Sequence, residues 1–415
     1  MSERALKPTF WVTGALFLFL GIFGWYDRLA NGHQNVNYTT LVPWGLWIAG
    51  YIYFIGLSAG SFLISSLVYV FHVRRFESIG RLALFSAVVT LLLALLMVWA
   101  DLGHMERAWE VLAYPNFRSP MAWMIWLYLA YFVLILVELW LLLRHDLVVG
   151  ADAPGFRGRL YRILSFGSHD RSEASAARDM RIVRVVGTIG IPVAIMFHGG
   201  VGALFGVVAA RPLWHSGNFP ILFLLSALTS GGALLTLISA FFQDGWHRNR
   251  ETVLALGRLV LGLLLLDLLF QFSEMLVAFY GAVPDAIWGF QQILAGPYWY
   301  VFWIGQILIG SLAPIVLLSL PIRRDARWVS FAGLLIMLGF LSVRLNIVVP
   351  GLAQEEVRGL ASAIASARVS NTYLPSATEW LLALGIAGFG LLLFGVGELL
   401  LPRENAAEGV ADVHA

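Results

Sequence analysis

The chain has 415 residues, of which 59% are hydrophobic and 13% are charged, and its formal net charge is +2. Soluble proteins carry about a quarter charged residues, so this composition excludes an ordinary soluble domain and indicates a polytopic membrane protein. The small net charge and the dispersed basic residues argue against nucleic-acid binding. The absence of cysteine excludes disulfides, thiolate metal sites and cysteine-ligated iron–sulfur clusters within this chain.

Ten apolar segments are long enough to cross a membrane, because a span needs roughly 20 apolar residues. They predict an all-α integral membrane protein with one transmembrane domain over 1–400 and a tail over 401–415. The spans are expected at about 9–26, 44–71, 82–100, 120–143, 184–209, 219–242, 256–280, 298–320, 328–348 and 377–400. The first span follows Arg4 and Lys7, but it is long for the apolar part of a signal peptide, so we expect it to be retained.

The distribution of Lys and Arg predicts the orientation. Most of them lie near the termini and in alternate loops, at 72–81, 144–183, 243–258 and 321–327. Since basic loops stay on the cytoplasmic side, we expect both termini to be cytoplasmic and Asp101 to face outward. The Arg-rich segment 144–183 is interpreted as a linker that faces anionic lipid, and the outer segment 349–376 as a loop with a short surface helix.

A short internal echo links two spans. The stretch SAGSFL (Ser58 to Leu63) resembles SGGALL (Ser230 to Leu235). One interpretation is a parallel repeat of two four-helix units. The other is that small residues recur wherever membrane helices pack closely. The sequence leaves both open.

Several ionisable residues fall inside the predicted spans, where each needs a partner or a function. Asp267 and Glu274 are seven residues apart and therefore share one helix face. Glu138 and His198 occupy other spans. These four residues are candidates for a proton route, although His198 can equally bond a neighbouring carbonyl and Glu138 can reach toward the membrane surface.

Arg344 and Glu379 lie near the outer ends of the last two spans, and we expect them to form a structural interhelical pair. Haem ligation by two histidines needs imidazoles at similar depth. His198 is central, His72 is at an inner end and His104 at an outer end. The sequence therefore predicts no haem and no metal site.

Asp101 and His104 stand three residues apart where the third span meets the outside. At this spacing they would share a helix face, and an imidazole oriented by a carboxylate exchanges protons near neutral pH. The alternative is an ordinary polar helix end meeting water. Composition and spacing do not decide between these two interpretations.

Four stretches read as motifs. They are PWGLWIAGYIYFIGLSAGSFL (Pro43 to Leu63), DLGHMERAWEVLAYPNFRSPMAWMIW (Asp101 to Trp126), GPYWYVFWIGQILIGSLAPIVLL (Gly296 to Leu318), and RLNIVVPG (Arg344 to Gly351) with YLPSATEW (Tyr373 to Trp380). Together they resemble the NrfD family of quinone-interacting membrane anchors. The likeness is nearest to the ten-helix branch that includes the HybB-like hydrogenase anchors, DsrP and the membrane subunits of alternative complex III.

The resemblance implies two four-helix bundles, over 38–210 and 219–348, with peripheral helices over 9–26 and 377–400. It implies a menaquinone or ubiquinone as substrate in the first bundle near the outer surface. It also implies electron exchange with an external ferredoxin-like iron–sulfur subunit and a periplasmic catalytic subunit, which would be a molybdopterin enzyme, a hydrogenase or a cytochrome. This chain would hold no haem or iron–sulfur cluster and would lie in a bacterial or archaeal cytoplasmic membrane.

On this interpretation, His104 and Asp101 are the candidate proton-exchanging residues of the quinone site. The residues expected to shape its mouth or wall the ring are Arg107, Tyr114, Asn116, Arg118 and Trp123. Many family members have Arg where this chain has His104, which leaves the proton-exchanging residue open. Glu138, His198, Asp267 and Glu274 would supply a coupled proton route.

Two other functions compete with this one. Ten spans with a possible repeat and acidic residues at mid-membrane also suit a secondary transporter, although the Gly and Pro interruptions expected of broken helices are modest here. A purely structural anchor for an external enzyme needs no buried ionisable groups, and this sequence has several.

Overall fold

The structure is a computed structural model that describes residues 3–242, 249–357, 359–364, 366 and 368–402. Within these ranges it confirms the all-α fold, with ten helical spans long and apolar enough to cross a membrane. They are α1 (Glu3–Asn31), α2 (Leu46–Tyr69), α3 (Gly80–Asp101), α5 (Pro120–Gly150), α7 (Glu173–Gly206), α8 (Phe219–Phe241), α10 (Arg250–Tyr280), η3 with α12 (Val301–Leu312 and Ala313–Ser319), α13 (Ala326–Ala353) and α15 (Ala377–Leu400). Most of the predicted tail, at 403–415, lies outside the described residues, as does Arg358.

Shorter helices connect these spans. They are η1 (Arg74–Ile79), η2 (Met105–Arg107), α4 (Glu110–Ala113), α6 (Phe156–Leu164), α11 (Pro284–Leu294), η4 (Pro321–Arg324) and α14 (Leu360–Ala363). The surface helix expected in 349–376 is therefore a single turn, α14. The helices α6 and α11 were not expected from hydropathy, because each is too short to register as a span.

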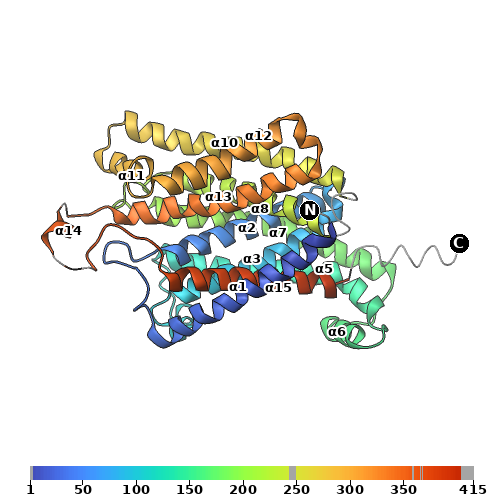
Figure 1. Cartoon of the computed structure of the whole chain (residues 1–415). Coiled ribbons are helices and arrows are strands. Elements are labelled where there is room, and N and C mark those ends of the chain that lie inside the picture. The colour runs from blue at the N-terminus through green and yellow to red at the C-terminus, as the bar shows by residue number, and fades with distance from the viewer. Residues whose placement is uncertain (1–2, 243–248, 358, 365, 367, 403–415) are drawn as a thin grey trace.

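The spans pack in two groups of four. We call α2, α3, α5 and α7 the first bundle, and α8, α10, η3–α12 and α13 the second bundle, because the members of each group contact one another. The helices α2 and α8 form the main contact between the bundles, while α1 packs along α15 on the outside of the first bundle. Figure 1 shows α1 and α15 side by side at one edge and α10 and α12 at the other.

The two echoed stretches meet at the contact between the bundles. A Cβ added to Gly60 of α2 would lie 2.0 Å from the backbone oxygen of Ala227 in α8. A Cβ added to Gly231 would lie 2.6 Å from the Cα of Gly60. Close approach of two backbones requires glycine at such points. The small residues therefore have a packing role here, whether or not the spans are also a repeat.

The first turn of α1 and the last turn of α15 lie at the same end of the bundle, together with α6 (Figure 1). We call this end the terminal face, and we call the other end, which carries α11 and α14, the opposite face. The long helices α5 and α7 have 31 and 34 residues. At about 1.5 Å per residue they exceed the roughly 30 Å hydrocarbon core. The predicted linker 144–183 is therefore largely helical, formed by the end of α5, by α6 and by the start of α7.

Candidate functional site

A partly buried carboxylate marks the end of α3 at the opposite face. Asp101 is the last residue of α3, and the Tyr38 hydroxyl donates a hydrogen bond to its Oδ1 at 2.6 Å. Tyr38 belongs to the connection between α1 and α2. Burial and the neighbouring Asp101 carboxylate raise the pKa of Tyr38 well above its ordinary value. Tyr38 therefore keeps its proton and remains a donor to Asp101.

His104 does not join this pair. The backbone of Leu102 is extended, so α3 has already ended and the three-residue spacing no longer keeps the two side chains on one face. His104 Nδ1 instead lies 3.0 Å from Glu106 Oε1, and the His104 side chain is 69% exposed. The expected contact between Asp101 and His104 is therefore wrong, because helix periodicity stops at Asp101.

Arg28 closes the end of α3 from the side of α1. Its Nε donates to the backbone oxygen of Ala100 at 2.7 Å, and its Nη2 donates to that of Leu102 at 2.5 Å. These carbonyls belong to the negative end of a helix, where a cation is favourable. Arg28 is buried, so it adds a fixed positive charge beside Asp101.

His33 lies against the same cluster. Its ring centroid is 5.7 Å from that of Tyr38 and 6.0 Å from that of Trp47. Burial, reinforced by the Arg28 cation, lowers the pKa of His33, and a hydrogen bond to Ala100 opposes this only in part. The Nε2 atom is buried and has no protein partner. His33 is therefore a neutral imidazole with one buried nitrogen that has no protein partner.

A second carboxylate with a tyrosine partner lies next to the first pair. Glu379 accepts hydrogen bonds from the Tyr373 hydroxyl and, at 2.8 Å, from the Ser376 backbone N–H. The Tyr373 ring lies 6.0 Å from that of Tyr38. Together with Ser376, Glu379 forms a capping box at the start of α15. The loop that carries Tyr38, near the start of the chain, therefore lies beside the segment that carries Tyr373 and Glu379, near its end.

A cavity of about 920 Å³ opens beside these residues. Its walls come from the loop after α1 and from the segment before α15, with His33, Tyr38, Arg368 and Tyr373 among the lining residues. Small-molecule sites usually measure about 300–1,000 Å³ and combine apolar walls with a few polar groups. The volume of this cavity falls within that range, and most of its lining side chains are polar. Two predicted residues, Asp101 and Glu379, have direct hydrogen bonds to residues that line it.

The other predicted quinone-site residues lie apart from this cavity. They are exposed on the segment that joins α3 to α5 and on the first turn of α5: Arg107, Tyr114, Asn116, Arg118 and Trp123. The Trp123 indole donates to the backbone oxygen of Phe117 at 2.8 Å. Three residues of the cavity, His33, Tyr38 and Tyr373, were not anticipated from the sequence. Tyr373 stood in the quoted YLPSATEW stretch, whereas His33 and Tyr38 carried no motif.

A second polar cluster occupies the middle of the molecule. Gln271 donates to Asp267 Oδ2 at 2.5 Å, Gln306 donates to Gln271 at 2.6 Å, and Asn346 donates to Gln306 at 2.7 Å. This series of hydrogen bonds crosses α10, η3 and α13. The η3 segment is a π-helix, and such widened turns are frequent at functional sites.

Arg344 also lies in this region, fully buried. It donates to Ser226 Oγ at 2.8 Å, and its Cζ lies 4.9 Å from the Phe223 ring centroid. Glu379 has its own partners near the cavity, so the expected pair of Arg344 with Glu379 is wrong. The two residues sit on helices that belong to different packing groups, with α13 in the second bundle and α15 against α1.

His198 stands close to Arg344. Its Nε2 lies 2.9 Å from the backbone oxygen of Phe223. A Cβ added to Gly56 of α2 would lie 3.4 Å from Arg344 Nη2 and 3.6 Å from His198 Cε1, so both side chains face the same point between the bundles. His198 thus bonds a neighbouring carbonyl, as one of its two sequence interpretations held.

Glu138 and Glu274 are apart from the central cluster. Glu138 of α5 is fully buried, and neither of its carboxylate oxygens has a protein partner. It abuts Gly187 of α7, where an added Cβ would lie 3.5 Å from Glu138 Oε1. Glu274 accepts a hydrogen bond from Ser216 at 2.7 Å, near the opposite face.

Comparison with known proteins agrees with this architecture. The profile of the family described as "Polysulphide reductase, NrfD" matches residues 34–355. A selenate reductase subunit of Mesobacillus selenatarsenatis is 38% identical over 99% of this chain and 97% of its own length. The Hdr-like menaquinol oxidoreductase integral membrane subunit of Archaeoglobus fulgidus is 27% identical over 94% and 93%. A polysulfide reductase polypeptide of Wolinella succinogenes is 26% identical over 76% and 96%.

The family profile covers well over half of the chain, and the similarity to the selenate reductase subunit extends over nearly its whole length. The ten apolar helices fit these relatives, of which one is described as an integral membrane subunit. The resemblance expected from the four sequence stretches is confirmed: the chain is a multi-pass integral membrane protein of the NrfD family.

Proposed function

We propose that this chain is the quinone-reactive membrane subunit of an oxidoreductase complex, and that the quinone headgroup binds in the cavity beside Tyr38 and His33. The observation that carries this proposal is the partly buried hydrogen bond from Tyr38, which lines a ligand-sized cavity, to the Asp101 carboxylate behind it. The relative from Archaeoglobus fulgidus, which is named as a menaquinol oxidoreductase subunit, supports the substrate class.

The chemistry of a quinol suits these groups. Oxidation of a quinol to a quinone releases two protons and two electrons. The neutral His33 imidazole lines the cavity, and the Asp101 carboxylate lies directly behind Tyr38 of the same wall. These two bases can each take a proton. Tyr38 keeps its own proton and orients Asp101. The electrons pass to an iron–sulfur subunit, and all steps reverse when a quinone is reduced.

The partners would dock on the opposite face, where the cavity opens. We propose a ferredoxin-like iron–sulfur subunit in contact with this chain and a catalytic subunit beyond it, on the outer side of a bacterial or archaeal cytoplasmic membrane. The exposed aromatic residues Trp109, Tyr114 and Phe117 lie on the segment between α3 and α5. Aromatic and arginine side chains are enriched at protein interfaces, and Arg107 and Arg118 lie on the same segment.

The test is the Asp101→Asn variant in the purified complex, with quinone turnover measured over a range of quinol concentrations. Asparagine still accepts the hydrogen bond from Tyr38 but cannot take a proton. We expect kcat to fall by about 10²–10⁴, the usual contribution of a general base. His104→Ala is the matched control, because His104 is close in sequence but exposed, and it should retain turnover. Wild-type kcat in Asp101→Asn would exclude this site, and purification of a solitary chain without quinone would favour a transporter.

A second candidate function is proton transfer across the membrane, coupled to quinone turnover. We propose the route through the residues anticipated for it, Glu138, His198, Asp267 and Glu274, with Arg344 as an additional member. One oxygen of Asp267, one nitrogen of His198 and two nitrogens of Arg344 are buried without protein partners. Buried polar atoms of this kind are usually hydrogen-bonded to internal water molecules, and chains of such water molecules conduct protons.

Vesicles with the reconstituted complex and an internal pH dye test this route. Wild type should change the internal pH during quinone turnover, and Asp267→Asn should abolish that change while retaining turnover in the presence of an uncoupler. Glu274→Gln, which lies nearer the surface, should have the smaller effect. Quinone turnover without any pH change in wild-type vesicles would contradict the coupled route.

A further inference from the structure

The short helix α6 is held at the depth where the spans end. Its Tyr161 hydroxyl donates to the backbone oxygen of Leu400 at 2.8 Å, and Arg157 Nη2 donates to that of Leu399 at 2.5 Å. These are the last residues of the span α15, whose final carbonyls have no partner within the helix. Because α15 ends at the terminal face, α6 lies at the boundary of the membrane on that face.

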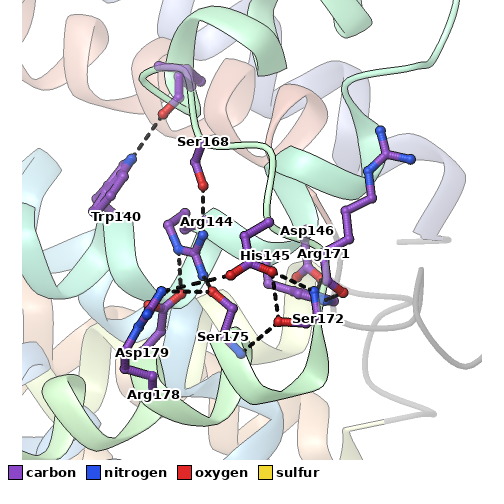
Figure 2. A network of polar contacts seen from close by, with 12 residues as sticks. Trp140, Arg144, His145, Asp146, Ser168, Arg171, Ser172, Ser175, Arg178 and Asp179 are labelled. Carbon is purple, nitrogen blue, oxygen red and sulfur yellow. Dashed lines mark hydrogen bonds and ion pairs between the residues drawn. The ribbon is translucent and has the colours of Figure 1, made fainter.

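A buried ionic network fixes the segment after α6 (Figure 2). Arg144 at the end of α5 pairs with Asp179 of α7, its Nε lying 2.5 Å from Asp179 Oδ2. Its other nitrogens donate to Ser168 and Ser175, at 2.7 and 2.5 Å. Ser168 follows α6, so this network ties the C-terminal side of α6 to two spans. The position of α6 is therefore set at both ends.

The face of α6 that points away from the protein is apolar. Phe156 is 64% exposed, Ile163 is 70% exposed, and Phe166 just after the helix is 78% exposed. The buried side of the helix is formed by Gly158 and Tyr161. Large apolar side chains grouped on an outward face mark a surface that water does not cover.

Phe166 supports this interpretation through its backbone. Its φ of 49° lies in the left-handed region, which a bulky residue rarely adopts. This conformation holds the Phe166 ring against Trp140, with centroids 5.9 Å apart. The Trp140 indole itself donates to the backbone oxygen of Leu164 at 2.9 Å. Tryptophan is typical of the level where lipid headgroups lie.

Two arginines flank the apolar face. Arg159 and Arg162 are exposed on α6, and among the described residues no carboxylate forms an ion pair with either of them. Arg144 and Arg171, in contrast, pair with Asp179 and Asp152. A helix with apolar side chains outward and cations at its flanks has the pattern of one that lies in the headgroup layer.

We propose that α6 with Phe166 is an interfacial element that inserts into the lipid at the terminal face and binds the phosphate of an anionic phospholipid through Arg159 and Arg162. The occupant is lipid because α6 is hydrogen-bonded to the last turn of α15 and Ser168 after it to α5, so its exposed apolar side chains lie at the level where the spans end. This site does not depend on the proposed quinone chemistry.

The absence of cysteine from the chain allows a direct test of the insertion. The full-length protein with Ile163→Cys is labelled with a fluorophore and reconstituted into vesicles of phosphatidylcholine and phosphatidylglycerol. Glu173→Cys, at the exposed start of α7, is the matched control. At position 163, lipids with shallow nitroxide labels should quench the fluorophore and aqueous iodide should not. At position 173, iodide should quench the fluorophore and the nitroxide lipids should not. Quenching by iodide at both positions would overturn the insertion.

The lipid charge is tested with the double variant Arg159→Gln and Arg162→Gln. The double variant Arg323→Gln and Arg324→Gln removes the same charge from exposed residues of η4. Native mass spectrometry then measures the enrichment of phosphatidylglycerol over phosphatidylcholine. Since each surface arginine contributes a factor of roughly five, the α6 variant should lose enrichment by about 25-fold and the η4 variant should lose less. An equal loss in the two variants, or no loss in either, would overturn the anionic site.

Discussion

Replacing Tyr38 by phenylalanine removes one oxygen atom from the cavity wall and leaves the ring in place. The ring packs with centroid distances of 5.7 Å to His33 and 6.1 Å to Trp47, so the packing should survive. The lost contact is the 2.6 Å hydrogen bond to Asp101. A hydrogen bond to a charged group contributes about 1.5–3 kcal/mol net. This corresponds to about a tenfold to hundredfold loss of kcat/KM if the bond orients Asp101 for proton transfer.

The assay is steady-state quinol oxidation or quinone reduction by the purified complex, with the thermal midpoint measured on the same preparations. Tyr114→Phe is the control, because it makes the same chemical change on an exposed side chain and should leave kcat/KM unchanged. If Tyr38→Phe keeps the wild-type kcat/KM and folds normally, the bond to Asp101 has no part in turnover. The reasoning from buried geometry to chemistry would then fail.

Three further predictions concern stability. The folded-state pKa of His33 lies below its ordinary value of 6.5, so the unfolded state takes up a proton first as the pH falls. Acidification below about pH 6.5 should therefore lower the thermal midpoint of the wild type more than that of His33→Gln. Parallel curves of thermal midpoint against pH for the two proteins would refute this. Gly60→Ala should lower the free energy of unfolding by about 1–3 kcal/mol through overpacking. Gly262→Ala, with nothing within 4 Å of its added Cβ, should leave the free energy of unfolding unchanged or raise it when both variants are measured by denaturation. Arg344 and Asp267 interact electrostatically, so Arg344→Met should lower the midpoint by leaving the Asp267 carboxylate without that cation. Adding Asp267→Asn should restore part of the loss, whereas additive effects would show that the two residues are not coupled.

The helical spans could be predicted because each depends on local composition. A stretch of about 20 apolar residues needs no distant partner to enter a membrane as a helix, and all ten expected spans are present among the described residues. Hydropathy did not predict the polar ends of helices that continue beyond the lipid. Residues 173–183 of α7 are polar, but Ser172 caps the helix by accepting from the Ser175 N–H at 3.2 Å. That start signal was visible in the sequence.

The partners of the ionisable residues could not be predicted in the same way. Spacing along the sequence assigned Asp101 a contact with His104, where the structure gives it a hydrogen bond from Tyr38. Arg344 was assigned to Glu379 from similar depth, while its bonded partner is Ser226. Each true partner lies dozens of residues away, in a segment that reaches the site through loops or helix packing.

By itself, the sequence determined that this protein is a ten-span helical membrane protein without thiol ligands and that it resembles the NrfD family. Those properties follow from apolar length, residue content and short contiguous motifs. Only the tertiary structure decided that the loop at 32–45 and the segment before α15 build one cavity, with the end of α3 bonded to its wall. It also decided that α6 presents its apolar face outward at the level of the span ends. The physical reason is that burial of charge and closure of a cavity depend on contacts between segments far apart in the sequence, and such contacts leave no periodic signal in it.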